Sequence, residues 1–205
     1  MTNKNSLLIE LHYLPNIRYM RQLMSAEQVL IEQHEHYRKG SYRNRAHIVG
    51  GNGLQRLSIP LLKGKNEQQN IRDTRISYHE NWLKQHWQSI SSAYGKSPFF
   101  EFYSDDLRPL FEKKEAFLFD FNLRLLEVLM DLLGMEIALA FTAEYNLKTK
   151  AHILDLRHSI LPKIPKDDGI RYAQVFEERH GFMPDLSVLD LLFCTGPEAL
   201  ALLDF

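Results

Sequence analysis

The sequence predicts an α/β (or α+β) protein with a mixed, partly parallel sheet in its N-terminal half and a helical C-terminal half. In the first half, short apolar runs flank one helical pattern, and such a strand, helix, strand unit favours parallel pairing through a right-handed crossover. In the second half, apolar residues recur at helical spacings instead. We expect a single domain over 1–205, sheet-rich over about 7–76 and helical over about 77–205.

Composition agrees with one folded domain and argues against several classes of partner. The chain has 205 residues, 44% of them hydrophobic, and 25 Lys and Arg balance 26 Asp and Glu. No global basic field draws it to nucleic acid. The single cysteine, Cys194, follows an apolar run and is expected to be buried and inert. The N-terminal apolar run is too short for a signal peptide or a membrane span, so we expect a cytoplasmic protein.

The predicted parallel unit consists of a strand at 7–11, a helix at 16–24 and a strand at 28–32. The strands are short apolar runs, and the helix carries apolar residues three positions apart after Pro15. The order of strands stays open, because a mixed sheet and two packed subdomains fit this pattern equally well.

Three more extended segments are predicted at 42–49, 54–62 and 71–76. The sequence Gly50-Gly51-Asn52-Gly53 lies between the first two and is a strong turn signal. We therefore expect the first two segments to form a hairpin.

Two long helices are predicted next. The spacing of a capping box at 77–80 precedes an apolar stripe that ends at Gly95. A second stripe covers 115–133, and Gly134 is placed to stop that helix.

The remaining third of the chain has weaker patterns. The segment 136–142 fits either a continued helix or a last strand, and 146–170 lacks periodicity, which predicts a long loop. Ser187 is placed to cap a helix over 188–193, and Pro197 to open a short terminal helix.

A series of short motifs follows in order along the chain. The motifs are Tyr13-Leu14-Pro15, Gln28 to Glu32, Asn44-Arg45, Leu57-Ser58-Ile59-Pro60, Trp82, His86-Trp87, Ser91 to Tyr94, Pro98-Phe99-Phe100, Asp155-Leu156-Arg157 and the run 184–193. Over about residues 7–134 their order and spacing resemble the WbqC-like protein family. The remainder looks like a version of the family found in Bacteroidetes-type bacteria.

This resemblance implies a transferase that tailors or assembles a nucleotide-linked sugar, because family members are similar to proteins encoded with bacterial surface-polysaccharide genes. The chain departs from the wider family at three places. It has Ile9-Glu10-Leu11 where the family tends to have His-Gln-Pro, Asn16 where it has a tryptophan, and Gln33-His34 where it often has an acid. If those groups are chemical in the family, the departures allow a shifted activity or none.

His34, His36 and His12 are the candidates for moving a proton. If 33–37 is extended, His34 and His36 project from the same face. Such a pair suits acid–base catalysis near neutral pH, or a metal site completed by a third ligand such as Glu10. The alternative is a solvated or hydrogen-bonded strand end. We assign no metal site and no cofactor.

Arg43, Asn44 and Arg45 are the candidates for binding an anion. On a strand the two arginines share a face, and two guanidinium groups suit bidentate capture of phosphate or carboxylate. The alternative is that one arginine pairs with a core acid and the other is solvated. Tyr13 lies where the first strand meets a helix start, which offers free N–H groups to the same anion.

Trp82 and His86 are predicted to line a cleft and to stack on a base or sugar, with packing at an interface as the alternative. They lie four residues apart on one helix, whereas Trp87 falls on the apolar stripe and is expected in the core. Asp155, Arg157 and Asp190 are expected to form an ion-pair network that ties down the C-terminal region.

Two functions remain in view. The first is a transferase acting on a small phosphate-bearing or nucleotide-linked sugar ligand, which side chains would have to hold because the chain lacks a glycine-rich phosphate loop. The second is a non-catalytic binding or assembly protein that keeps the anion site. The sequence leaves the oligomeric state open.

Overall fold

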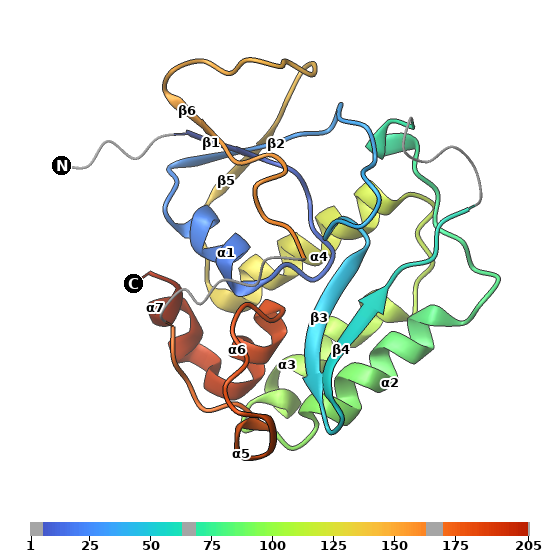
Figure 1. Cartoon of the computed structure of the whole chain (residues 1–205), viewed down its shortest axis with the longest axis vertical. Helices are drawn as coiled ribbons and strands as arrows, with labels where there is room; N and C mark the ends of the chain where they lie inside the picture. Colours follow the sequence, from blue (N-terminus) through green and yellow to red (C-terminus); the bar gives the residue numbers. More distant parts are fainter. Residues whose placement is uncertain (1–5, 63–68, 163–169, 205) are drawn as a thin grey trace.

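Four parallel strands form the main sheet of the computed structural model, which describes residues 6–62, 69–162 and 170–204. They are β1 (Ser6–Ile9), β2 (Gln28–Ile31), β5 (Ala138–Phe141) and β6 (Ile153–Asp155), in the order β5-β2-β1-β6. Figure 1 shows α1 and α4 on one side of this sheet and the connection between β5 and β6 projecting away from them.

The two faces of the sheet differ in burial. Residues paired in parallel register share a face, and Leu7 pairs with Val29 while Leu8 pairs with Leu30. The inner face is sealed: its central residues, each at most 2% exposed, are Leu7, Ile9, Val29 and Ile31. The outer face carries Leu8, Leu30 and Ile153, of which the last two are only half-buried.

The predicted hairpin forms a separate antiparallel sheet. It consists of β3 (Arg45–Gly50) and β4 (Gly53–Ser58). Gly53 has φ of 96°, a left-handed conformation that glycine adopts without a steric penalty. The helix α2 (Trp82–Tyr94) packs against β3.

Two helices begin and end as their sequences dictate. In α1 (Ile17–Met24) the Asn16 side chain accepts a hydrogen bond from the Tyr19 backbone N–H at 3.0 Å, which satisfies a donor at the helix start. In α4 (Leu118–Leu133) the chain leaves the helix at Gly134, which has φ of 70°.

Shorter helices complete the C-terminal part. Ser187 caps α6 (Val188–Thr195), since its hydroxyl accepts a hydrogen bond from the Leu189 backbone N–H at 3.4 Å. The other short elements are α3 (Phe100–Leu107), α5 (Glu177–His180), α7 (Ala199–Leu203) and the 3-10 turns η2 (Ile71–Asp73), η3 (Arg108–Phe111) and η4 (Gly196–Glu198).

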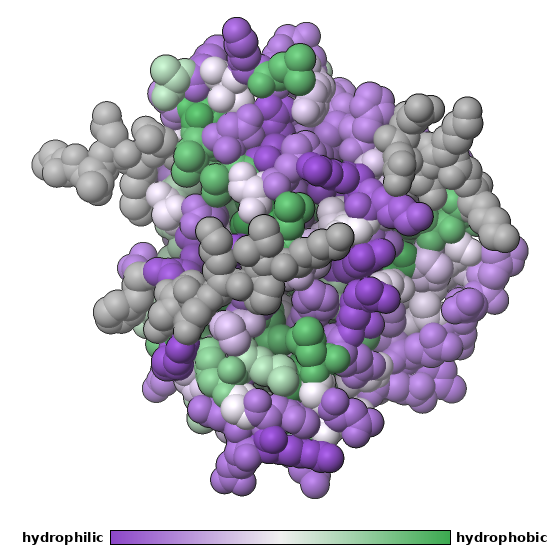
Figure 2. All heavy atoms as spheres, in the orientation of Figure 1, coloured by the Kyte–Doolittle hydropathy of each residue, from purple (hydrophilic) through white to green (hydrophobic). Residues whose placement is uncertain are grey.

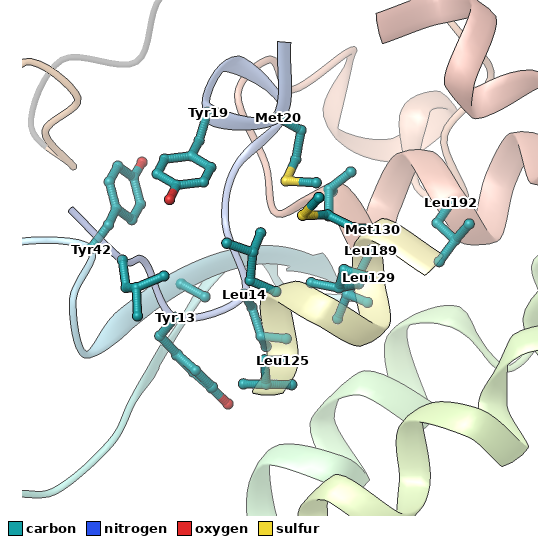
Figure 3. Packing of buried hydrophobic residues seen from close by; sticks show 14 of the residues in the cluster. Tyr13, Leu14, Tyr19, Met20, Tyr42, Leu125, Leu129, Met130, Leu189 and Leu192 are labelled. Carbon is teal, nitrogen blue, oxygen red and sulfur yellow. The ribbon is translucent and has the colours of Figure 1, made fainter. Parts of the chain in front are cut away.

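One continuous apolar core joins these parts. Figure 3 shows Tyr13 and Leu14 from the loop after β1 packing among Met20 of α1, Leu125 of α4 and Leu189 of α6. Regions far apart in the sequence therefore share one core, as expected for a single domain.

None of the helices in the described part of the chain has the length and apolar character that a membrane span requires. Figure 2 shows small apolar groups among many hydrophilic side chains on one face.

The predicted class is confirmed, with a single domain and a parallel unit of β1, α1 and β2. The hairpin, the helices near α2 and α4 and both C-terminal helices are confirmed as well. For 136–142 the strand alternative is correct, because β5 pairs with β2.

Four predictions were wrong in detail. The segment 146–170 contains β6, whose three residues are too few for a period but pair with β1, so the predicted helical half supplies two strands of the main sheet. The segment 71–76 begins with η2, because the Asn70 side chain caps a turn there. The capping-box spacing at 77–80 starts no helix, since α2 begins at Trp82. The strand predicted at 42–49 begins only at Arg45.

Candidate functional site

Polar side chains gather where the parallel strands end. Glu10 follows β1, Glu32 follows β2, Thr142 follows β5 and Arg157 follows β6. The carboxyl ends of parallel strands lie at one edge, and in open α/β sheets ligands bind there, at the point where the strand order reverses. The chain runs outward from β1 through β2 to β5 and then returns to β6 on the other side of β1. The reversal therefore lies between β1 and β6.

Arg43 is the centre of the polar cluster at this reversal. Its side chain is fully buried, and its Nε and Nη2 donate to Oε1 and Oε2 of Glu35 at 2.7 and 2.5 Å. Its Nη1 lies 3.3 Å from Oε1 of Glu10. One guanidinium group therefore serves two buried carboxyl groups, which an arginine fork does well because its donors are fixed in a plane.

His158 joins this cluster from the end of β6. Its backbone N–H donates to Oε2 of Glu10 at 3.0 Å, and its Nδ1 accepts from Nη2 of Arg43 at 2.9 Å. Because Arg43 can only donate, the proton of a neutral His158 ring resides on Nε2. The side chain is 30% exposed, whereas that of Glu35 is 2% exposed. His158 is thus the part of the cluster that meets solvent.

The backbone at His158 is in a conformation that histidine seldom adopts. Its φ is 63°, and the other non-glycine residues with positive φ in the described part are Leu14 and Asp185. Left-handed backbone at such residues costs about 1–3 kcal/mol and concentrates at functional sites.

The two carboxyl groups on Arg43 have pKa values displaced in opposite directions. Burial favours the neutral form of Glu10, but hydrogen bonds from His12 and the His158 backbone, together with the charge of Arg43, lower its pKa to about 2. Burial raises the pKa of Glu35 to about 7, with help from the charges of Glu10 and Glu32 and against the pull of Arg43. Carboxyl groups that one environment drives apart in this way are a recurrent mark of acid–base sites.

The surroundings of both histidines of the cluster favour the neutral form by lowering their pKa values. Burial, followed by the charges of Arg43, Arg38 and Arg157, lowers the pKa of His158, although Glu10 opposes this. Burial also lowers the pKa of His12 despite its contact with Glu10.

A second network adjoins the first at the ends of β2, β5 and β6. Oε1 of Glu32 accepts from the Thr142 hydroxyl at 2.8 Å, and its Oε2 accepts from Nη1 of Arg157 at 2.8 Å. Arg157 also donates from Nη2 to Asp155 at 2.7 Å. The expected Asp155–Arg157 ion pair is therefore present, whereas Asp190 hydrogen-bonds Tyr172 and Gln174 instead.

The structure brings only some of the predicted catalytic residues to the cluster. His12 lies in it, fully buried and 3.4 Å from Glu10, with its ring against Tyr19 and Tyr42. His34 is half-buried against the carbonyl of Thr142, and His36 is exposed. The segment 33–37 is not a strand, so the two histidines do not form the expected pair on one strand face. Their catalytic roles stay predictions.

The predicted anion-binding residues also separate. Arg43 pairs with core acids and lies before β3, whereas Arg45 begins β3 and is half-buried. Asn44 is buried, since its side chain donates to the carbonyl of Ile59 and accepts from the Tyr37 hydroxyl. This arrangement matches the alternative in which one arginine pairs with core acids.

Tyr13, Trp82 and His86 form a buried aromatic group. The Tyr13 hydroxyl lies 2.7 Å from Nδ1 of His86, and the ring of Trp82 meets that of His86 edge-on. Their exposures are 0%, 2% and 6%, and burial lowers the pKa of His86 to about 4. Trp87, expected in the core, is half-buried against Phe100 and Phe111. Cleft-lining roles for Trp82 and His86 stay predictions.

The sequence analysis did not identify Glu35 and His158 as site residues. It also did not predict that Glu10 and Glu32 lie in the polar networks at the ends of β1 and β2. A signal for the two glutamates exists, because each is the charged residue that interrupts or ends the short apolar run of a strand in the predicted parallel pair. No local pattern marks His158, since its role depends on the pairing of β6 with β1. Among the described residues, no three His, Cys, Asp or Glu side chains are grouped to hold a metal ion.

The chain belongs to the WbqC-like protein family, whose model matches residues 11–166. It is also similar to a protein of Mycobacterium tuberculosis named "Uncharacterized protein Rv1507c", with 27% identity over 223 residues and 96% of each chain covered. No solved structure matches the chain. The assignment to a Bacteroidetes-type branch stays a prediction.

Proposed function

We propose that the chain is a transferase that acts on a phosphate-bearing or nucleotide-linked sugar, in bacterial surface-polysaccharide biosynthesis. Its active site is the cluster of Glu10, Glu35, Arg43 and His158 at the carboxyl ends of β1 and β6. Family membership and the resemblance of the sequence support the substrate class, and the cluster supports a catalytic role.

The observation that carries the proposal is that Glu10 and Glu35 contact the same arginine, Arg43, and yet have pKa values displaced in opposite directions. The pKa of Glu10 is about 2 and that of Glu35 is about 7. A structural ion pair has no need of a second carboxyl group that changes its charge near neutral pH. Since Oε2 of Glu35 lies 3.9 Å from Nδ1 of His158, the ionisation of Glu35 sets the charge beside the partly exposed imidazole.

The surroundings of His158 favour an anionic ligand. Arg38 is exposed, and its charge, like those of Arg43 and Arg157, disfavours protonation of the His158 ring. The same positive potential attracts a phosphate group. Arg38 would contact that phosphate, because Arg43 is already engaged by two carboxyl groups.

His158 would act as a neutral hydrogen-bond donor in this reaction. Its Nδ1 is occupied by Arg43, which leaves the Nε2–H to donate to a substrate oxygen on which negative charge develops. Glu10 holds the backbone N–H of His158, and Arg43 holds its ring. Glu10 and Arg43 are therefore positioning residues.

The test is thermal unfolding of the purified chain with a panel of nucleotide sugars, nucleoside phosphates and free sugars. A ligand at 100 times its Kd adds about 2.7 kcal/mol of stability. We expect phosphate-bearing compounds to stabilise the chain and Arg38→Ala to remove the effect. Arg108→Ala is the matched control, because Arg108 is exposed and pairs only with Glu112 among the described residues.

Turnover of the stabilising compound then separates the two functions. We expect His158→Ala to lower kcat by about 10²–10³, as the loss of one such donor does elsewhere, with a smaller change in binding. Binding without turnover in the parent chain would favour the binding or assembly protein. A panel that produces no shift would rule out the phosphate-bearing substrate class.

A further inference from the structure

A pocket on the outer face of the main sheet is separate from the cluster around His158. Its volume is about 370 Å³, and its floor consists of Leu8, Leu30 and Ile153. The connection between β5 and β6 forms the opposite wall, and Figure 1 shows this connection projecting beyond the strands. Arg157 lines the pocket, whereas His158 does not. Ligand pockets of about 300–1,000 Å³ with apolar linings are typical of small-molecule sites.

Glu32 and Arg157, two polar residues of the pocket lining, differ in how many of their hydrogen-bonding groups have partners. Glu32 accepts hydrogen bonds on both oxygens, from His34, Thr142 and Arg157. Arg157 has five N–H groups, and the described residues accept four of them: Asp155 accepts two, and Glu32 and the carbonyl of Asn146 accept one each. One Nη1–H of Arg157, a side chain 4% exposed, remains without an acceptor among the described residues.

The wall formed by the β5–β6 connection adds positive charge. Lys148 and Lys150 both line the pocket, and both are exposed. Neither makes an ion pair with a described carboxylate. The acids of the lining are Glu32, which is paired with Arg157, and Glu144, which accepts from the Asn146 side chain and keeps its charge. Three cations, Arg157, Lys148 and Lys150, face these two acids in the lining, and the two lysines are the cations without a described partner.

We propose that this pocket binds a small molecule with an apolar body and one carboxylate group. The body would lie on Leu8, Leu30 and Ile153, of which the half-buried Leu30 and Ile153 are the part of the floor that otherwise meets water. The carboxylate would accept from the remaining Nη1–H of Arg157 and lie near Lys148 and Lys150. This proposal is independent of the proposed function, because it involves neither His158 nor Arg38.

The probe is octanoate, titrated by calorimetry into the full chain below the concentration at which octanoate forms micelles. Octylammonium has the same apolar body with the opposite charge and is the matched control ligand. We expect octanoate to bind at one site and octylammonium to bind at least tenfold more weakly. Equal binding of the two, or no binding of octanoate, would overturn the proposal.

Variants locate the binding. Replacing Lys148→Gln together with Lys150→Gln should weaken octanoate binding roughly threefold to tenfold, the effect of removing two exposed charges. Lys84→Gln with Lys96→Gln is the control, since both lysines are exposed and lie outside the pocket. Leu30→Trp should fill the floor and abolish binding. An unchanged affinity in the first pair would show that octanoate binds elsewhere.

A membrane surface presents the same chemistry, and a further arm separates it from a free ligand. Leu147 is 86% exposed and Tyr145 is 40% exposed on the same connection. The parent chain and the Leu147→Ser variant are sedimented with phosphatidylglycerol vesicles. If the parent chain sediments with the vesicles, the variant does not, and the parent chain binds no free octanoate, the connection is a membrane contact and the pocket proposal fails.

Discussion

Glu10 and Asp190 are both almost fully buried, with exposures of 1% and 0%, yet their surroundings differ. Glu10 lies beside Arg43, and its pKa is about 2. Asp190 accepts hydrogen bonds from the Tyr172 hydroxyl at 2.7 Å and the Gln174 amide at 2.9 Å, and burial raises its pKa to about 6. The carboxyl group of Asp190 is therefore bound by neutral donors, whereas that of Glu10 lies beside Arg43, an arginine that it shares with Glu35.

The comparison shows what separates a structural contact from a candidate site in this fold. The Asp190 cluster ties α6 to the segment before it, since Gln174 also bonds the backbone of Met183 at both N–H and carbonyl. Every described polar partner of Asp190 is neutral. The Arg43 cluster instead combines opposed pKa shifts with a half-exposed imidazole at the reversal of strand order. Burial of a carboxyl group alone therefore does not indicate a site.

The largest effect is expected from Arg43→Met. This change leaves two buried carboxyl groups without their cation, and breaking a buried pair in this way costs about 3–5 kcal/mol. Urea unfolding at pH 7 measures the loss. Arg108→Met, on an exposed pair, should change stability by no more than about 0.5 kcal/mol. A loss below about 1 kcal/mol for Arg43→Met would mean that water, rather than Arg43, solvates the cluster.

The pH dependence of stability should differ in sign between the two carboxyl groups. The folded pKa of Asp190 is about 6, above its ordinary value of 3.8, so its contribution to stability is present at low pH and is lost as pH rises through this interval. The folded pKa of Glu10 is about 2, below its ordinary 4.5, so its contribution is lost as pH falls through that interval.

Unfolding measured from pH 3 to pH 7 in two variants checks these signs. Asp190→Asn should remove a fall in stability on the order of 2 kcal/mol between pH 4 and pH 6. Glu10→Gln should leave that fall in place. If Asp190→Asn leaves the profile unchanged, the Asp190 carboxyl group titrates normally and the contrast with Glu10 disappears.

Elements with their own local pattern could be predicted, whereas the site depends on contacts distant in sequence. The helical spacing of apolar residues in α4, together with Gly134 after it, was enough to predict that helix and its end. β6 has three residues and exists because it pairs with β1. Its place at the edge of the sheet brings His158 to Glu10, 148 positions earlier in the chain. No window of the sequence contains that contact.

The histidine-rich segment shows the same limit on a smaller scale. Regular alternation over 33–37 would have placed His34 and His36 together, but the chain bends there. Glu35 then points inward to Arg43, while His36 is exposed. The histidine pattern therefore located the right segment but selected the wrong side chains. The side chain that reaches the buried cluster is Glu35, which is hydrogen-bonded to Arg43.

A smaller effect is expected from Tyr172→Phe. This change removes one of the hydrogen bonds to Asp190 and leaves that from Gln174, so we expect a loss of about 1 kcal/mol at pH 7. The pKa of Asp190 should rise further, because fewer donors stabilise its charged form. Combined with Asp190→Asn, the Tyr172 change should show a reduced effect in a double-mutant cycle. Fully additive losses would show that Tyr172 acts through packing instead.

A last effect, no larger than that of Tyr172→Phe, concerns the backbone at His158. His158→Gly and His158→Ala both remove the imidazole, but at φ of 63° only glycine avoids the clash of Cβ with the backbone. The glycine variant should therefore be more stable than the alanine variant by about 1 kcal/mol in urea unfolding. Both variants should lose the proposed turnover to the same extent, because both lack the Nε2–H donor. Equal stability of the two variants would show that His158 stores no strain, and its backbone would then give no support to a catalytic role.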